Sequence, residues 1–448
     1  MKNKNKQSFK FLKEFNICEK EEEISEVAVS PSNQYIAVAK KKRVRVDNRR
    51  YRYKHYVEIW DLGDKKGSEK KIHGYSHRAH IIELVFSKDG TLLASCSENA
   101  GIKILQLKDK TIIKRLCPGS KSILGGAIIR FSSDNNYFVL QFRGNDRIHI
   151  CNLTRKNDVR HVDVKHDIES FILSDDSKWL VISSRQFPSS MSDDHILKVD
   201  LYSLATGVLK NVVCERVSDG YNRFCFYRYG RSNLIVSSNG RYLVGGNGHF
   251  IFLYDLILQT ILAKNSSLEK KVSTYIFFNN DKNLLMLTEG YRKGYVSELP
   301  GPRREQQHLC LDSEGIRPAR GPLNYDLFIT PCKKYIFWCE DNHLDDLWKL
   351  YFVDLDMGFG VDKYYSYRSE ALCCRRRESL VKAAFFNNYE KMVCVGAKGT
   401  VRLFRTPEDL YFSSQKAIKQ EKAKKAFFKV LSENKKSKKF SDLKVSFN

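Results

Sequence analysis

The chain has 448 residues with 77 Lys and Arg against 52 Asp and Glu, so its formal net charge is +25. Hydrophobic residues make up 42% of the chain and aromatic residues 12%, whereas Gly and Pro number 25 and 9. These values exclude disorder over most of the length and exclude collagen-like or Pro-rich chains. The basic balance suggests a nucleic-acid or anionic-membrane partner if the charge is concentrated in one place.

The first 13 residues carry five Lys and no acidic residue, and no apolar run of signal-peptide type follows them. No apolar stretch reaches the roughly 18–20 residues that a membrane-spanning helix needs. The twelve cysteines include no CxxC pair. We therefore expect a cytoplasmic or nuclear protein with reduced thiols.

One pattern recurs along the chain: an apolar alternating run, a polar turn, and two further apolar runs. The clearest copy has runs at 82–87, 92–97 and 101–105, with a turn of hairpin type at 88–90. Because each run alternates with a period of two residues, it predicts a half-buried strand.

The first turn of each copy marks the repeat. These turns begin at Ser30, Ser87, Ser132, Ser174, Ser237, Asn279, Thr330 and Phe386. Their spacings range from 42 to 63 residues, and the short ones match the roughly 40–45 residues of one propeller blade. The sequence therefore predicts an all-β fold, a propeller of four-stranded blades, with eight blades and seven as the alternative.

Several copies carry residues that resemble the WD-repeat family of β-propellers. The signature dipeptide stands at Trp60 and Asp61, and Gly74-Tyr-Ser-His77 is similar to the Gly-His element of the family. The resemblance covers about residues 24–406. It implies a structural hydrogen-bond network of His77, Ser95 and Glu98, which is incomplete because Leu105 replaces the family's Trp.

The repeats divide the chain into three parts. Residues 1–23 form an N-terminal extension, residues 24–406 the propeller, and residues 407–448 a basic tail. By the resemblance, a strand at 9–15 closes the ring, with Phe9, Phe11 and Phe15 on one face. Closure by residues 410–412 is the alternative.

Most of the positive charge lies in three segments outside the regular repeat, which are residues 1–13, 40–54 and 415–448. Residues 40–54 have a net charge of +8, as do residues 415–448, whereas most of the ring is nearly neutral. Tyr51 and Tyr53 alternate with arginines in the first block, a composition that suits phosphate contact and base stacking but also an exposed twisted hairpin. The candidate phosphate-binding residues are Lys40, Lys41, Lys42, Arg43, Arg45, Arg49, Arg50, Arg52 and Lys54.

The tail at 415–448 contains eleven Lys and no Arg. Its apolar residues at 418–431 approximate one helical face, so we expect it to be partly helical. Such a segment suits a membrane surface or a partner groove, and it also suits docking on its own propeller or a solvated extension.

Motifs of catalysis are missing from the sequence. There is no GxxxxGK[ST], HExxH or GxSxG motif. His73, His77 and His80 have a spacing similar to that of metal ligands, but no helix, cysteine or carboxylate cluster accompanies them. We therefore predict no catalytic residue, no cofactor and no metal site.

These observations predict a non-enzymatic interaction scaffold with protein partners on the loops at 40–54, 186–194, 301–321 and 343–347. The alternative is a propeller associated with RNA or a ribonucleoprotein that binds phosphates through its basic extensions. An enzyme built on a propeller is a third hypothesis, which would need His, Asp and Glu to converge at the central channel.

Overall fold

The structure is a computed structural model that describes residues 10–406 with gaps. The gaps are residues 32–33, 48–49, 63–68, 99–100, 117–126, 143–145, 156–157, 187–193, 219–233, 238, 248–249, 266–271, 279–280, 282, 289–292, 300–306, 311–326, 330–334, 343–346, 355–367, 373–379 and 386–390. Phe9, Arg49 and the basic tail at 407–448, with its expected helical segment, therefore lie outside the described residues.

The described strands form four-stranded antiparallel sheets, eight within the described ranges. The first sheet contains β2 (Glu22–Val29), β3 (Tyr35–Arg45), β4 (Tyr51–Asp61) and β5 (Lys70–His77), and the second contains β6 (Ile81–Phe86), β7 (Leu92–Ser97), β8 (Ile102–Gln106) and β9 (Thr111–Leu116). The third contains β10 (Ala127–Phe131), β11 (Tyr137–Phe142), β12 (Arg147–Asn152) and β13 (Val159–Asp163). The fourth contains β14 (Asp167–Leu173), β15 (Trp179–Gln186), β16 (Asp194–Ser203) and β17 (Leu209–Ser218). The fifth sheet contains β18 (Leu234–Val236), β19 (Tyr242–Asn247), β20 (Phe250–Asp255) and β21 (Thr260–Asn265). The sixth contains β22 (Val272–Phe278), β23 (Asn283–Thr288), β24 (Lys293–Glu298) and β25 (Gln307–Cys310). The seventh contains β26 (Leu327–Ile329), β27 (Tyr335–Asn342), β28 (Leu347–Asp354) and β29 (Arg368–Leu372). The last sheet joins β1 (Lys10–Asn16) to β30 (Leu380–Phe385), β31 (Lys391–Gly396) and β32 (Thr400–Arg405).

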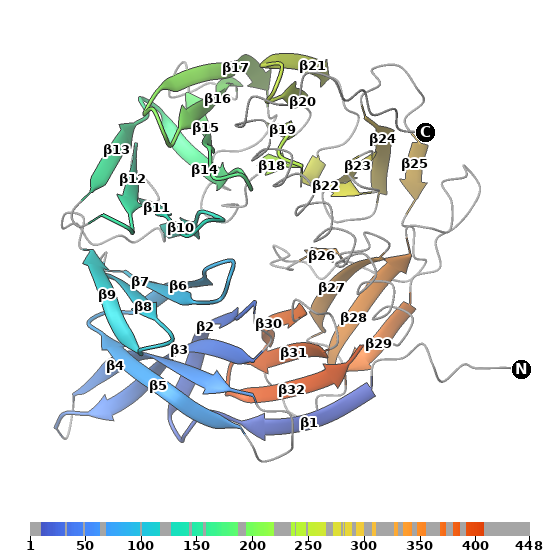
Figure 1. The fold of residues 1–448 in the computed structure, drawn as a ribbon. Coiled ribbons are helices and arrows are strands. Elements are labelled where there is room, and N and C mark those ends of the chain that lie inside the picture. Colours follow the sequence, from blue (N-terminus) through green and yellow to red (C-terminus); the bar gives the residue numbers. More distant parts are fainter. Residues whose placement is uncertain are drawn as a thin grey trace, which may run out of the picture.

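The sheets follow one another around a ring in chain order (Figure 1). The all-β prediction and the four-stranded unit are thereby confirmed. Within the described residues there is no helix with the length and apolar character that crossing a membrane requires.

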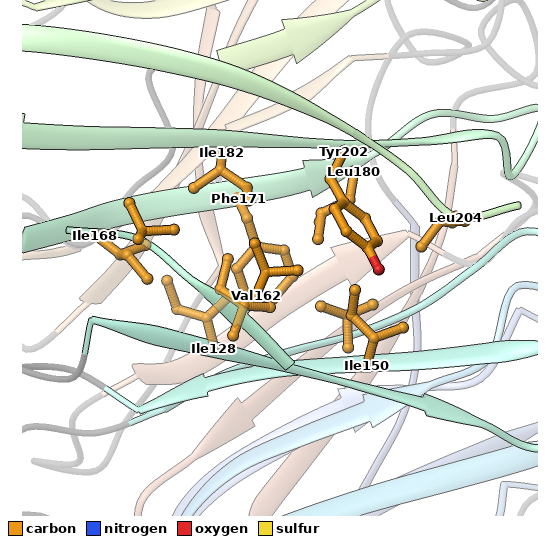
Figure 2. Close-up of a cluster of buried hydrophobic side chains, with 12 residues drawn as sticks. Ile128, Ile150, Val162, Ile168, Phe171, Leu180, Ile182, Tyr202 and Leu204 are labelled. Atoms are coloured by element: carbon orange, nitrogen blue, oxygen red, sulfur yellow. The ribbon is translucent and has the colours of Figure 1, made fainter. Parts of the chain in front are cut away.

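Apolar side chains hold the ring together between neighbouring sheets. Figure 2 shows one such cluster, in which Ile128 and Ile150 from one sheet meet Phe171 and Ile182 from the next. Comparable clusters lie between the other neighbouring sheets from β1 round to β25. A four-stranded sheet has two faces to bury, and stacking in a ring gives each sheet a neighbour on both sides.

The repeated turns share one hydrogen-bond pattern, which explains why the sequence pattern was visible. In each of four turns, the hydroxyl of a buried serine donates a hydrogen bond to the side chain of an Asp or Asn two residues later. The same hydroxyl oxygen accepts a hydrogen bond from the backbone N–H five residues after the serine. The serine–acceptor pairs are Ser87–Asp89, Ser132–Asp134, Ser174–Asp176 and Ser237–Asn239, with distances of 2.5–2.7 Å. The residue after each acceptor has a positive φ, as at Gly90 and Asn135, which Gly and Asn adopt at low cost.

We predict that Ser132→Ala lowers the free energy of unfolding by about 1–3 kcal/mol, because it leaves the partly buried N–H of Tyr137 without its 2.9 Å acceptor. Urea unfolding of the purified protein measures this. Ser133→Ala is the matched control at the neighbouring, less buried position, where a change within about 0.5 kcal/mol is expected. Equal effects of the two substitutions would show that the turn pattern does not carry the stability.

The strand β1 completes the sheet of β30–β32 by pairing antiparallel with β32, from Lys10 opposite Arg405 to Asn16 opposite Thr400. Ile17 then donates its N–H to the carbonyl of Gly399 at 3.0 Å. Gly399 has a φ of +94°, and a Cβ there would lie 2.5 Å from that of Cys18. Only glycine therefore lets the N-terminal segment come this close to the β31–β32 turn.

The expectation that Phe11 and Phe15 lie on one face of this strand is wrong. Phe15 packs against the core, but Phe11 is 53% exposed and makes an edge-to-face contact with Phe404. The reason is a β-bulge between Phe11 and Lys13, which breaks the period-two alternation and brings Leu12 to the core.

Candidate functional site

The hairpin of β3 and β4 extends past its own sheet. The last register pairs with the flanking strands are Glu22–Lys42 on β2 and His55–His77 on β5. Beyond them β3 and β4 continue to pair with each other as far as Arg45 and Tyr51. This projecting end, with Lys41 and Lys42 at its base, contains most of the predicted phosphate-binding residues, and we call residues 41–54 the basic hairpin.

The structure divides the predicted phosphate-binding residues into three groups. Arg43, Arg45, Arg50, Arg52 and Lys54 are exposed. Arg50 forms an ion pair of 2.8 Å with Asp47, and among the described residues no carboxylate lies within ion-pair distance of Arg43, Arg52 or Lys54.

The second group, Lys41 and Lys42, is half-buried. Each lysine is neutralised by a glutamate, with 2.9 Å to Glu23 and 2.6 Å to Glu19 respectively. The third group is Lys40 alone, and its assignment as a phosphate-binding residue is wrong. Its side chain is only 2% exposed, so an external phosphate cannot reach it.

Lys40 lies at the centre of a buried polar network between the first sheet and the N-terminal segment. Its Nζ lies 2.6 Å from Glu58 Oε2 and 3.3 Å from Glu22 Oε2, and it donates to the carbonyl of Ile17. It also faces the ring of Trp60 at 5.6 Å from the centroid. The amphipathic stem of lysine fits the core here because its head meets three oxygen atoms.

Further side chains bind the two carboxylates of this network. Tyr56 donates to Glu22, while Trp60 Nε1 and Lys71 Nζ both lie 3.0 Å from Glu58. Burial alone would raise the pKa of Glu22, but the Tyr56 hydrogen bond, a backbone N–H and Lys40 together hold that pKa below its usual value. Burial and the bond to Glu22 raise the pKa of Tyr56, so the tyrosine stays protonated.

One face of the basic hairpin combines arginines with tyrosines. Because side chains alternate along a strand, Arg43 and Arg45 on β3 lie on the same face as Tyr51 and Tyr53 on β4. The guanidinium of Arg43 stacks over the ring of Tyr51 at 3.9 Å. We call these four residues the arginine–tyrosine face.

The polar network implied by the resemblance forms with one change of member. His77 Nε2 lies 2.8 Å from Ser95 Oγ, and the other ring nitrogen lies 3.2 Å from Ser97 Oγ. Glu98 is an exposed turn residue, so its assignment to this network is wrong, and Ser97 takes the second position. Sequence spacing alone could not separate these neighbours, because the strand ends between them.

The signature dipeptide, Trp60 and Asp61, makes contacts other than those of the His77 network. Trp60 packs against the core cluster beside Lys40, and Asp61 accepts a 2.9 Å hydrogen bond from Gln34. Both residues therefore stabilise the first sheet.

Burial lowers the pKa of His77 to about 4. The unfolded chain binds more protons between pH 6.5 and 4, so the stabilisation by neutral His77 is complete above pH 6.5 and is lost as pH falls toward 4. We predict that the difference in unfolding free energy between wild type and His77→Asn shrinks by about 2–3 kcal/mol from pH 7 to 4.5. Urea unfolding at several pH values measures this difference, and a pH-independent difference would contradict the prediction.

Two features of the described residues bear on acid–base or metal chemistry. Burial raises the pKa of Glu83 on β6 to about 7, although Arg130 at 2.8 Å and the Ile129 N–H at 3.1 Å bind its carboxylate. Within the described ranges, no group of three or more His, Cys, Asp and Glu side chains could hold a metal ion. Of the histidines with metal-like spacing, His77 is bound to serines and His80 contacts the ring of His55.

A cluster of exposed aliphatic residues was missed in the sequence. Val208, Leu209, Ile257, Leu258 and Ile261 are each 41–70% exposed and lie at the β16–β17 and β20–β21 turns of neighbouring sheets. Hydrogen bonds of 2.7 Å link the two outer strands and turns, from Lys210 to Gln259 and from Lys264 to Glu215. We call these five residues the apolar rim.

The turn that presents Ile257 and Leu258 is built by Asp255. This fully buried carboxylate accepts the N–H groups of both residues at 2.8 and 2.9 Å and also binds Arg241. The backbone is thus held while the two side chains point outward. Adjacent aliphatic residues directly after a strand-ending Asp were the sequence signal that could have revealed them.

The fold and a match to a known family together indicate the class of protein. The ring of four-stranded antiparallel sheets is the architecture of a β-propeller. Residues 69–105 match the WD40 family, described as "WD domain, G-beta repeat". The fold is therefore that of a β-propeller, and the resemblance predicted from the sequence is confirmed by this match to one repeat.

A solved structure of similar fold is the β-propeller domain of Cps50 (Swd1) from Myceliophteria thermophila. It is 13% identical in sequence, the match covers 74% of this chain and 97% of that one, and the TM-score is 0.44. No curated protein matches the chain in sequence.

Proposed function

We propose that this protein is a non-enzymatic scaffold whose eight sheets are eight propeller blades and which binds a protein partner at the apolar rim. The observation that carries the proposal is the exposure of five large aliphatic side chains over two linked turns. Contiguous apolar surface of this kind marks interaction sites, whereas single exposed aliphatic residues are ordinary.

The surroundings of the apolar rim support a protein as the partner. Lys210 and Gln259 follow Leu209 and Leu258 directly in the chain and bond to each other, so polar side chains accompany the apolar ones. This is the common anatomy of a protein–protein interface. The turn is held by Asp255, so the surface is organised before a partner arrives.

We propose that the complex forms in the cytoplasm or nucleus.

Affinity purification from cells tests the proposal. The variant carries Ile257→Lys and Leu258→Lys, and the matched control carries Ile113→Lys and Val159→Lys, which lie on the outer strands β9 and β13 and are also exposed. Loss of a captured protein with the first variant and its retention with the control are expected. Equal capture by both variants, with and without nuclease, would contradict the apolar rim as the partner site.

The basic hairpin favours a second candidate function, the association with RNA. Its exposed arginines and tyrosines support this function, and the half-buried Lys41 and Lys42 contribute less because glutamates neutralise them. RNA binding by the full-length protein should weaken steeply between about 50 and 200 mM salt if several phosphates are bound.

A further inference from the structure

We propose that the arginine–tyrosine face of the basic hairpin binds a single-stranded nucleic acid, with bases stacked on Tyr51 and Tyr53 and phosphates bound by Arg43 and Arg45. This inference rests on the second candidate function and specifies its site. It excludes Lys40 from the site and places Arg52 and Lys54 on the opposite face of the hairpin.

The two tyrosines form an exposed stacking surface. Tyr51 is 49% exposed and Tyr53 is 55% exposed, although both are large aromatic residues that ordinarily bury much of their area. They are separated by one residue on the same strand, which sets them about 6.8 Å apart along it. This is about twice the 3.4 Å rise between stacked bases, so successive bases meet successive rings when the strand is extended and its bases are unstacked from one another.

Positive charge lies directly across the hairpin from each ring. In the register of the two strands, Arg43 is opposite Tyr53 and Arg45 is opposite Tyr51. The contact with Tyr51 holds the Arg43 guanidinium 3.9 Å from the ring centroid, and Arg45 Nε donates to the carbonyl of Asp47 at 3.2 Å. Both cations are thus placed beside the rings, where a backbone phosphate would lie next to a stacked base.

The rings continue toward the body of the protein. His55 follows Tyr53 at 6.4 Å between ring centroids, and His80, in the connection between β5 and β6, follows His55 at 5.7 Å. An extended ligand therefore meets a line of flat side chains that starts at the projecting end of the hairpin. Burial, His80 and Lys41 lower the pKa of His55, so its ring is neutral at physiological pH.

The chemistry of this surface distinguishes between ligands. Flat rings that alternate with guanidinium groups recognise unpaired bases, and the bases of a duplex are already stacked on one another. An acidic peptide would use the arginines but gain little from the tyrosine rings. A single strand uses both residue types, and we therefore assign it to this face.

Fluorescence anisotropy with labelled 12-nucleotide oligouridine RNA and the equivalent oligothymidine DNA tests the assignment on the full-length protein. We expect at least one strand to bind, and we expect Tyr51→Ala with Tyr53→Ala to weaken that binding by at least about tenfold. Tyr51→Phe with Tyr53→Phe keeps the rings and should retain affinity within about threefold. Thermal unfolding of each variant verifies that the fold is unchanged.

A charge-matched pair of variants separates a specific site from general attraction. Arg43→Gln with Arg45→Gln and Arg52→Gln with Lys54→Gln remove the same charge from opposite faces of one hairpin. The first pair should weaken binding more and should reduce the salt slope by about 1.4, since a single-stranded contact contributes about 0.7 per phosphate.

The outcomes separate the inference from the function on which it rests. Equal losses from the two charge variants, no loss in the tyrosine-to-alanine variant, or equally strong competition by polyglutamate or by anionic lipid vesicles would overturn the arginine–tyrosine face. If neither strand binds the full-length protein at low salt, the second candidate function fails as well. The protein-partner proposal at the apolar rim is unaffected by either result.

Discussion

Lys40→Met is expected to lower the free energy of unfolding by about 3–5 kcal/mol. The substitution keeps most of the side-chain volume but leaves Glu22 and Glu58 buried without the cation that lies 3.3 and 2.6 Å from them. It also leaves the carbonyl of Ile17 without the Nζ donor. Equilibrium denaturation with urea at pH 7 measures the loss.

The neighbouring residue supplies the control. Lys41→Met removes a lysine that pairs with the largely exposed Glu23, and exposed pairs contribute about 0–1 kcal/mol. If the two substitutions cost the same, the network around Lys40 does not have the role that its geometry indicates. A restored stability in the combination of Lys40→Met with Glu58→Gln would support it, since a buried charge is then removed together with its partner.

Deletion of residues 1–16 is expected to lower the free energy of unfolding by more than about 5 kcal/mol, which approaches the whole stability of many proteins. The deletion removes β1, and with it the packing of Leu12 and Phe15 and the ion pair of 2.7 Å between Lys13 and Glu69. Removal of a single buried apolar side chain costs about 2–5 kcal/mol, and here several are lost together with the hydrogen bonds to β32.

Two comparisons make this prediction specific. Deletion of residues 1–9 leaves β1 in place and should retain most of the stability. A synthetic peptide that spans Lys10–Asn16 and its flanking residues should partly restore the thermal stability of the protein lacking residues 1–16. Similar unfolding curves for the two deletions would show that β1 does not close the ring in solution.

The part of the fold that rests on short-range chemistry could be predicted from the sequence. In four described turns a serine and an Asp or Asn two residues later form the same structure, so anchors such as Ser87 and Ser174 were visible without tertiary information. The four-stranded unit followed from the spacing of these turns.

The candidate site needed long-range information. Lys40 stands in an unbroken run of basic residues, and nothing local separates it from the exposed part of that run. Its burial arises because β2 and the N-terminal segment cover it, and Ile17 is 23 positions away in the chain. The bulge before Lys13 and the place of Glu98 after the end of β7 likewise depend on pairing partners that the period-two pattern does not reveal.

The pairing of β1 with β32 also has a consequence for the order in which the protein is made. Lys10 is synthesised almost 400 positions before its partner Arg405. Until then β32 is not available to pair with β1, so Leu12, Phe15 and Ile17 stay without their final neighbours. Contacts of such high sequence separation form slowly. The final closure of the ring is therefore expected only after β32 has been synthesised, and the N-terminal segment is the part that a chaperone would need to protect meanwhile.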